Sequence, residues 1–133
     1  MSIALVRELN GEHRVLLKTL GTIAEDGKLS AETRDLLGKT KTALLAHISK
    51  EERDFYPALK KLAVTTPGIE PKLAQMNREM ESLAAAALRF LDEYSTGGDP
   101  ERFPSDFSDF RRALSERIQR EEFTLYAYFL KRA

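Results

Sequence analysis

A short stretch from His47 to Pro57 constrains the fold of this chain more than any other part of the sequence. His47 and Glu51 are four residues apart, so on a helix their side chains point to the same side. That side also carries a mostly apolar set of residues, Thr40, Leu44, Ile48, Phe55 and Leu59. A helix face of this kind is normally buried, and a buried charge without a partner is costly. We therefore expect the imidazole and the carboxylate to share a partner inside a helix bundle, and a metal ion is the natural one.

The apolar residues recur with the 3.6-residue period of amphipathic helices, and no long stretch alternates with the period of two that marks a strand. We predict four helices, over about residues 2–24, 30–62, 71–94 and 104–129. Ser30 is expected to cap the second helix, which should be the longest of the first three and disturbed near Pro57. Because the connections are short, the predicted fold is all-α: an antiparallel up-down-up-down four-helix bundle that forms a single domain over residues 1–133.

Charge and composition exclude several classes of function. Lys plus Arg and Asp plus Glu both number 21, so bulk charge indicates neither a nucleic acid nor a membrane partner. The chain has no Cys, which excludes iron–sulfur clusters, thiolate metal sites and disulfides. The N-terminus lacks the apolar run of a signal peptide, and no segment is long and apolar enough for a membrane span. We therefore expect a cytoplasmic protein.

The two halves of the chain repeat each other. The segment from Asn10 to His13 resembles that from Asn77 to Met80, and the segment from His47 to Glu52 resembles that from Arg117 to Glu122. Tyr56 in the first half likewise corresponds to Tyr126 in the second. A two-helix unit used twice can build a site on a pseudo-twofold axis, with one metal ion in each half.

These motifs resemble the hemerythrin-like (HHE) cation-binding domain. The resemblance rests on a Glu-His pair in the first helix, a His-x-x-x-Glu followed by Tyr-Pro in the second, and a similar order in the second half. It covers nearly the whole chain, and it implies a four-helix bundle that holds two irons with a histidine from each helix and carboxylates from the second and fourth. On this resemblance the metal ligands would be His13, His47, Glu51 and Glu121.

The sequence departs from that family pattern at three positions. Met80 and Arg117 stand where the histidines of the third and fourth helices are expected, and Ala127 replaces the second proline. Only two histidines are present in the chain, so the full histidine set cannot be assembled. The remaining nitrogen and oxygen ligands suit one divalent metal, Fe, Mn or Zn. Arg117 would bring a permanent positive charge into the other half of the site and could bind either carboxylate there.

Two functions of different classes follow from this pattern. The first is a degenerate di-iron site in a sensory, regulatory or interaction bundle, with no metal or at most one metal bound. The alternative is a functional iron-binding domain for oxygen or diatomic sensing or for iron storage. We expect no enzyme activity, because the sequence shows no nucleophile–base pair. Arg117 would also occupy the position of the second metal ion, which an oxidase of this type requires.

Two structural expectations can be checked directly. Six side chains should point into one interior layer, those of His13, His47, Glu51, Met80, Arg117 and Glu121, with the Arg117 guanidinium within hydrogen-bonding distance of Glu51 or Glu121. The neighbouring carboxylates of Glu12, Glu52 and Glu122 are expected to form a solvated face. The apolar run from Tyr126 to Leu130 would either pack against the connection between the second and third helices or form a surface for a homodimer or another protein partner.

Overall fold

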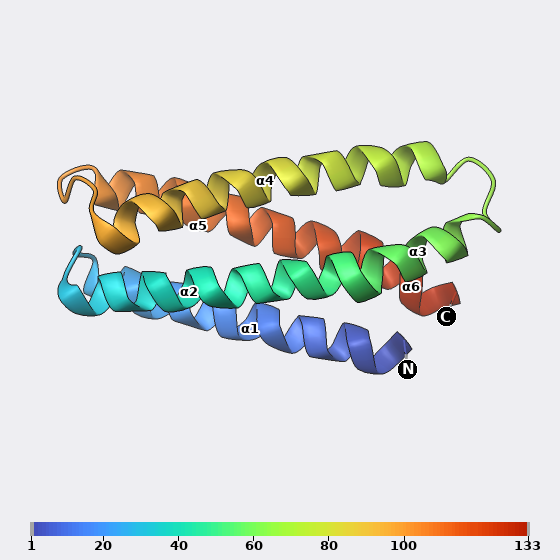
Figure 1. Ribbon diagram of the computed structural model, residues 1–133, viewed down its shortest axis with the longest axis horizontal. Coiled ribbons are helices and arrows are strands. Elements are labelled where there is room, and N and C mark those ends of the chain that lie inside the picture. Colours follow the sequence, from blue (N-terminus) through green and yellow to red (C-terminus); the bar gives the residue numbers. More distant parts are fainter. Residues whose placement is uncertain (1, 133) are drawn as a thin grey trace.

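Four long helical rods run antiparallel to one another in the computed structural model, which describes residues 2–132 (Figure 1). The elements in chain order are α1 (Ser2–Asp26), α2 (Ala31–Lys50), η1 (Glu51–Phe55), α3 (Tyr56–Ala63), α4 (Glu70–Thr96), α5 (Phe103–Arg120), η2 (Glu121–Tyr126) and α6 (Ala127–Arg132). The second rod is the continuous run α2–η1–α3, and the fourth is the run α5–η2–α6. Within the described residues there is no strand, so the predicted all-α antiparallel four-helix bundle is confirmed.

The helices begin and end close to where the sequence signals place them. The Ser30 hydroxyl accepts a hydrogen bond from the Thr33 backbone N–H at 3.1 Å, which caps α2 as predicted. Gly27 turns the chain after α1 with a φ of 67°, a conformation that a side chain would disfavour. Pro71 and Pro104 occupy the first turns of α4 and α5, where the missing N–H removes no helical hydrogen bond. The second rod is the longest of the first three, also as predicted.

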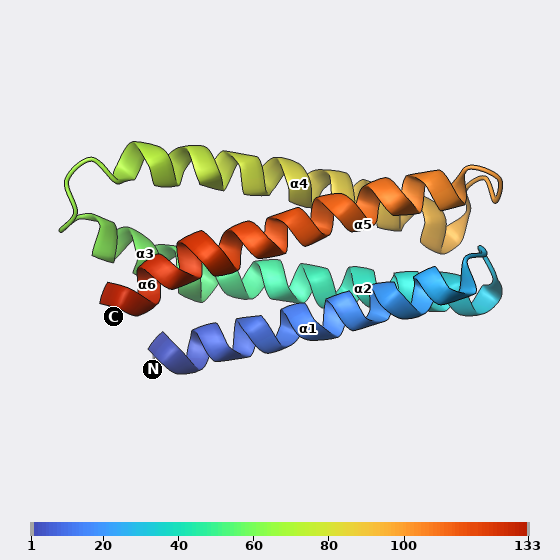
Figure 2. The ribbon, with the colours of Figure 1, turned by 180° about the vertical axis from the view of Figure 1, so that it is seen from behind.

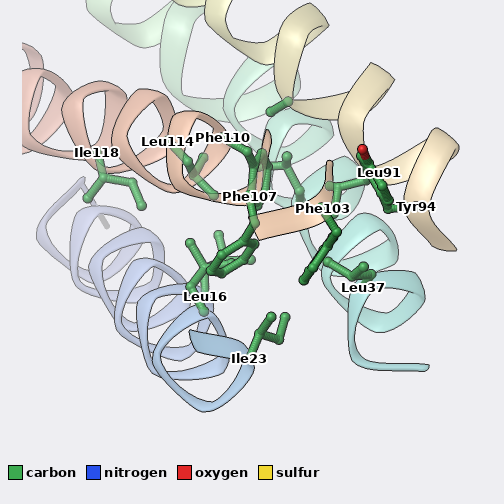
Figure 3. Packing of buried hydrophobic residues seen from close by; sticks show 13 residues of the cluster. Leu16, Ile23, Leu37, Leu91, Tyr94, Phe103, Phe107, Phe110, Leu114 and Ile118 are labelled. Carbon is green, nitrogen blue, oxygen red and sulfur yellow. The ribbon is translucent and has the colours of Figure 1, made fainter. Parts of the chain in front are cut away.

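Two apolar clusters fill the bundle and leave a polar layer between them. One cluster occupies the end near the α1–α2 and α4–α5 connections, where aromatic residues of α5 pack between α1, α2 and α4 (Figure 3). The other surrounds Phe55, Leu125 and Phe129 near the chain termini. On α1, Leu9 belongs to the second cluster and Leu16 to the first. His13 lies between these two leucines, so it belongs to the polar layer that divides the core.

The second and fourth rods each contain one widened, π-helical segment, η1 and η2. Within η1 the register is set by the Tyr56 backbone N–H, which donates to the Glu51 carbonyl five residues earlier. The disturbance predicted near Pro57 is therefore present but begins at Glu51. Pro57 is not its general cause, because η2 forms with Ala127 at the corresponding position. Both segments instead begin at a glutamate, Glu51 or Glu121, with a tyrosine five residues later. Tyr56 directly follows η1, and Tyr126 is the last residue of η2.

The C-terminal apolar run packs against the connection between α3 and α4. The Tyr128 hydroxyl donates to Thr66 Oγ1 at 2.8 Å, which confirms the first of the two roles predicted for this run. Figure 2 shows the same end of the bundle from behind, with α6 beside the start of α1. The Leu130 side chain remains 42% exposed, and a homodimer or protein partner at this end stays a prediction. None of the described helices is long and apolar enough to cross a membrane.

Candidate metal centre

All six side chains predicted for the interior layer are buried there. His13, His47, Glu51, Met80, Arg117 and Glu121 are each at most 4% exposed. They come from all four rods, so the layer exists only when the bundle closes. This confirms the alignment of the two halves of the chain that the sequence suggested.

The two histidines are held by carboxylates from neighbouring rods. His13 Nδ1 lies 2.7 Å from Glu122 Oε2, and His47 Nδ1 lies 2.7 Å from Glu12 Oε1. Because a carboxylate accepts, each Nδ1 carries the proton and donates it, which leaves the lone pair on Nε2. Burial lowers the pKa of both imidazoles despite these carboxylates, so both rings are neutral. Within the described part of the chain, both Nε2 atoms are buried and have no hydrogen-bond partner.

Glu12 and Glu122 were expected on a solvated face, and that prediction is wrong. Their side chains are about a third exposed, yet each orients a buried histidine. Each carboxylate is next in sequence to an inward residue but bonds a histidine on another rod, as Glu12 of α1 does with His47 of α2. Glu52, by contrast, is exposed as predicted. The signal that could have identified the pair is the carboxylate–histidine arrangement that metal-ligating imidazoles usually have.

The two inward glutamates are held crosswise by tyrosines. The Tyr126 hydroxyl donates to Glu51 Oε2 at 2.6 Å, and the Tyr56 hydroxyl donates to Glu121 Oε2 at 3.2 Å. Burial raises the pKa of both phenols, so they stay protonated as hydrogen-bond donors. The second oxygen of each carboxylate faces an imidazole. Glu51 Oε1 lies 3.5 Å from His47 Nε2, and Glu121 Oε1 lies 3.3 Å from His13 Nε2.

Arg117 lies within hydrogen-bonding distance of Glu51, as predicted, and also forms a longer ion pair with Glu121. Its Nη2 lies 3.2 Å from Glu51 Oε1 and 3.7 Å from Glu121 Oε2, while its Nη1 donates to the Met80 carbonyl at 2.7 Å. Burial opposes its charge, but the two carboxylates outweigh that effect and hold the pKa of Arg117 above its usual value. The guanidinium is therefore a permanent cation in the half of the layer that contains Met80.

One positive charge does not balance two ionised carboxylates, so the layer needs a protonated histidine, a metal ion or a proton on one of the carboxylates. The lowered pKa values of both histidines disfavour a protonated imidazole. Instead, burial and the nearby Glu121 carboxylate raise the pKa of Glu51 to about 8. Without a metal, the layer thus reduces its negative charge by keeping a proton on Glu51.

Four groups in this layer are positioned to hold one metal ion. His13, His47, Glu51 and Glu121 each offer one ligand atom, and these atoms all lie within 4.8 Å of one another. Three atoms of the cluster, both Nε2 atoms and Glu121 Oε1, are buried acceptors without a hydrogen-bond donor. A cation would satisfy all three, and two nitrogens with two carboxylates suit Fe, Mn or Zn. The donor set therefore fits a single divalent metal and leaves coordination positions free.

Comparison with protein families gives one match that covers nearly the whole chain. The family described as the hemerythrin HHE cation binding domain matches residues 4–129. Comparison with curated proteins and with solved structures gives no match. The family match agrees with both the bundle and the histidine–glutamate cluster described above.

Proposed function

This chain belongs to the hemerythrin HHE cation-binding domain family, and from that premise we propose that it is a sensory or regulatory bundle that binds one divalent metal ion in a degenerate di-iron site. The observation that carries the proposal is the pair of inward Nε2 lone pairs, each fixed by a carboxylate on Nδ1 and each without a donor. A buried acceptor without a partner is costly, and a cation at this position removes that cost.

The proposed metal is iron, held by His13, His47, Glu51 and Glu121. When bound, it would supply a redox-active cation with free coordination positions. The protein's own contribution is to orient the four ligands, through Glu12 and Glu122 on the imidazoles and through tyrosines on the carboxylates.

A second metal ion has neither ligands nor a favourable charge in the other half. Met80 offers a thioether, which is a poor ligand for ferrous or ferric iron. Its backbone carbonyl already accepts a hydrogen bond from Arg117. The guanidinium beside both carboxylates repels a further cation. With one metal, the site lacks the paired cations of a two-metal catalyst, so we propose a binding and signalling role rather than an enzyme.

The test is the metal content of the purified chain after anaerobic reconstitution with ferrous ion. We expect one iron per chain in the wild type and in Glu52→Gln, which changes an exposed carboxylate outside the cluster. We expect none in His13→Ala or in His47→Ala, with helical content checked by circular dichroism. Two irons in the unmodified chain, or none, would overturn the proposal.

A metal-free interaction bundle is the second candidate, and the Arg117 contacts favour it. The guanidinium and the proton on Glu51 together compensate the two carboxylates without a metal ion. This candidate predicts that iron, manganese and zinc all fail to bind after reconstitution, and that none of them raises the melting temperature. The metal analysis above therefore discriminates between the two candidates.

A further inference from the structure

Tyr126 contacts two of the four proposed ligands from different directions. Its hydroxyl lies 2.6 Å from Glu51 Oε2, and its ring stacks on the His13 ring with a centroid distance of 5.6 Å and an interplanar angle of 6°. The side chain is 1% exposed and is enclosed by Phe55, whose ring meets it edge-on at 5.0 Å. It is thus a buried, oxidisable phenol with a proton acceptor already in hydrogen-bond contact.

The corresponding tyrosine of the first half is placed less closely. Tyr56 is only half-buried, and its hydroxyl lies 3.2 Å from Glu121 Oε2. Among the aromatic pairs of the described residues, it stacks on neither histidine. The two tyrosines therefore form a matched pair that shares chemistry and differs in contact with the ligands.

With Arg117 in place of a second metal ion, the site can supply only one electron from metal. Two ferrous ions could give two electrons to a two-electron oxidant, whereas one ferrous ion gives one and a guanidinium gives none. An oxidant such as hydrogen peroxide then requires its second electron from a nearby side chain. Tyr126 touches the ligands Glu51 and His13 directly, so it is the best-placed donor in the layer.

A small oxidant can reach this layer from the seam between the second rod and α4. A cavity of about 640 Å³ lies there, and its lining includes the buried side chains of Arg117 and Met80. The exposed residues Glu52 and Lys60 line the same cavity, so it connects solvent with the half of the site that holds no metal ligands of its own. Hydrogen peroxide is small and neutral and fits such a route.

We propose that Tyr126 supplies the second electron when hydrogen peroxide oxidises the iron-loaded protein, an inference that rests on the function proposed above. Tyr126 loses one electron, and its phenolic proton leaves by way of Glu51 Oε2, which leaves a tyrosyl radical. An iron held by His13, His47, Glu51 and Glu121 would supply the other electron by going from ferrous to ferric. The O–O bond breaks, and with one further proton from solvent both oxygens leave as two waters.

The experiment titrates the ferrous protein anaerobically with less than one equivalent of peroxide and counts the ferric ions formed. In the wild type we expect one ferric ion per peroxide and a tyrosyl radical by freeze-quench electron paramagnetic resonance. Tyr126→Phe keeps the stacked ring and removes only the hydroxyl. It should lose the radical and double the ferric ions formed per peroxide, because iron must then supply both electrons. The control variant Tyr94→Phe removes a buried hydroxyl in the other core cluster, away from the proposed ligands, and should behave as the wild type.

Iron per chain is measured before peroxide is added, and it distinguishes failure of the proposed metal binding from failure of the Tyr126 inference alone. A wild type without iron overturns the proposed function and this inference together. An iron-loaded protein overturns this inference alone if Tyr126→Phe keeps the radical and the wild-type ratio, or if peptide mass spectrometry finds Met80 sulfoxide in place of a radical. If Tyr126→Phe does not bind iron, a radical trap added to the wild type identifies the tyrosine that carries the radical. An adduct at Tyr126 supports the inference, and one at Tyr56, Tyr94 or Tyr128 overturns it.

Discussion

Glu122 is about a third exposed, yet its carboxylate fixes the orientation of a histidine that is 1% exposed. On its own helix Glu122 follows the inward Glu121, and its direction there predicts a solvent-facing residue. Its actual partner, His13, is 109 positions away in sequence, so only the packing of the fourth rod against α1 brings the two together. The burial of the four candidate ligands could be predicted because their own helices point them inward. Their outer partners could not, because those contacts depend on the neighbouring helix.

Removal of the Glu122 carboxylate should weaken metal binding without unfolding the chain. We expect Glu122→Ala to lower ferrous affinity by about 10- to 100-fold, the usual cost of losing a carboxylate on a metal-bound imidazole. The control is Glu52→Ala, since Glu52 is the counterpart of Glu122 in the repeat and is exposed. Competition against a metal-binding dye measures both affinities. Equal losses in the two variants would contradict the role assigned to Glu122.

The proton on Glu51 predicts how the stability of the metal-free chain depends on pH. Its pKa is raised from 4.5 to about 8 on folding, so between these values the native state binds a proton that the unfolded chain has lost. The free energy of unfolding therefore falls as pH rises through that window, by at most about 1.4 kcal/mol per pH unit. The lowered histidine pKa values act in the opposite direction up to about pH 7.5, because unfolded imidazoles with a pKa of 6.5 still bind some protons there.

Urea denaturation of chelator-treated protein between pH 6.5 and 8 isolates the Glu51 effect when the wild type is compared with Glu51→Gln, because both chains keep the two histidines. We expect stability to fall with rising pH in the wild type relative to Glu51→Gln, which keeps the shape of the side chain and can still accept from Tyr126. An unchanged slope in Glu51→Gln would show that the native state does not hold its extra proton there.

The elements show where sequence patterns reach their limit. The four rods, the Ser30 cap and the Gly27 turn follow from periodicity and local chemistry, and each could be predicted. The segments η1 and η2 could not, because one widened turn leaves the apolar spacing of a long helix nearly unchanged over five or six residues. Pro57 suggested a disturbance in the second rod, but Ala127 gave no comparable sign in the fourth.

The pair of π-helical segments allows the role of proline to be tested. Because η2 forms without a proline, we expect Pro57→Ala to keep η1 and to change ferrous affinity by no more than about twofold, the effect of an ordinary exposed substitution. Dye competition and thermal melting measure affinity and stability. A large loss of metal binding in Pro57→Ala would mean that the proline itself holds Glu51 in place and that the two segments have different causes.

At the scale of the whole molecule, the second half repeats the outer charged pair of the first half around positions that carry no histidine. In the first half Lys50 pairs with Glu12, the carboxylate that holds His47. In the second half Arg120 pairs with Glu79 at 2.5 Å, and Glu79 corresponds to Glu12 in the repeat. The outer charges have thus been retained around Met80 and Arg117, although neither residue is a ligand for iron.

Restoring both histidines should therefore restore a second site. In the double variant Arg117→His and Met80→His, the permanent cation is gone, and Glu52 and Glu79 are available as carboxylates for the new imidazoles. We expect two irons per chain after anaerobic reconstitution, against one in the wild type. Met80→His alone should bind only one, because the remaining Arg117 guanidinium still repels a second cation beside Glu51 and Glu121. If Met80→His alone binds two irons, the charge of Arg117 is not what limits the site. If the folded double variant gains none, the second half lacks more than its ligands.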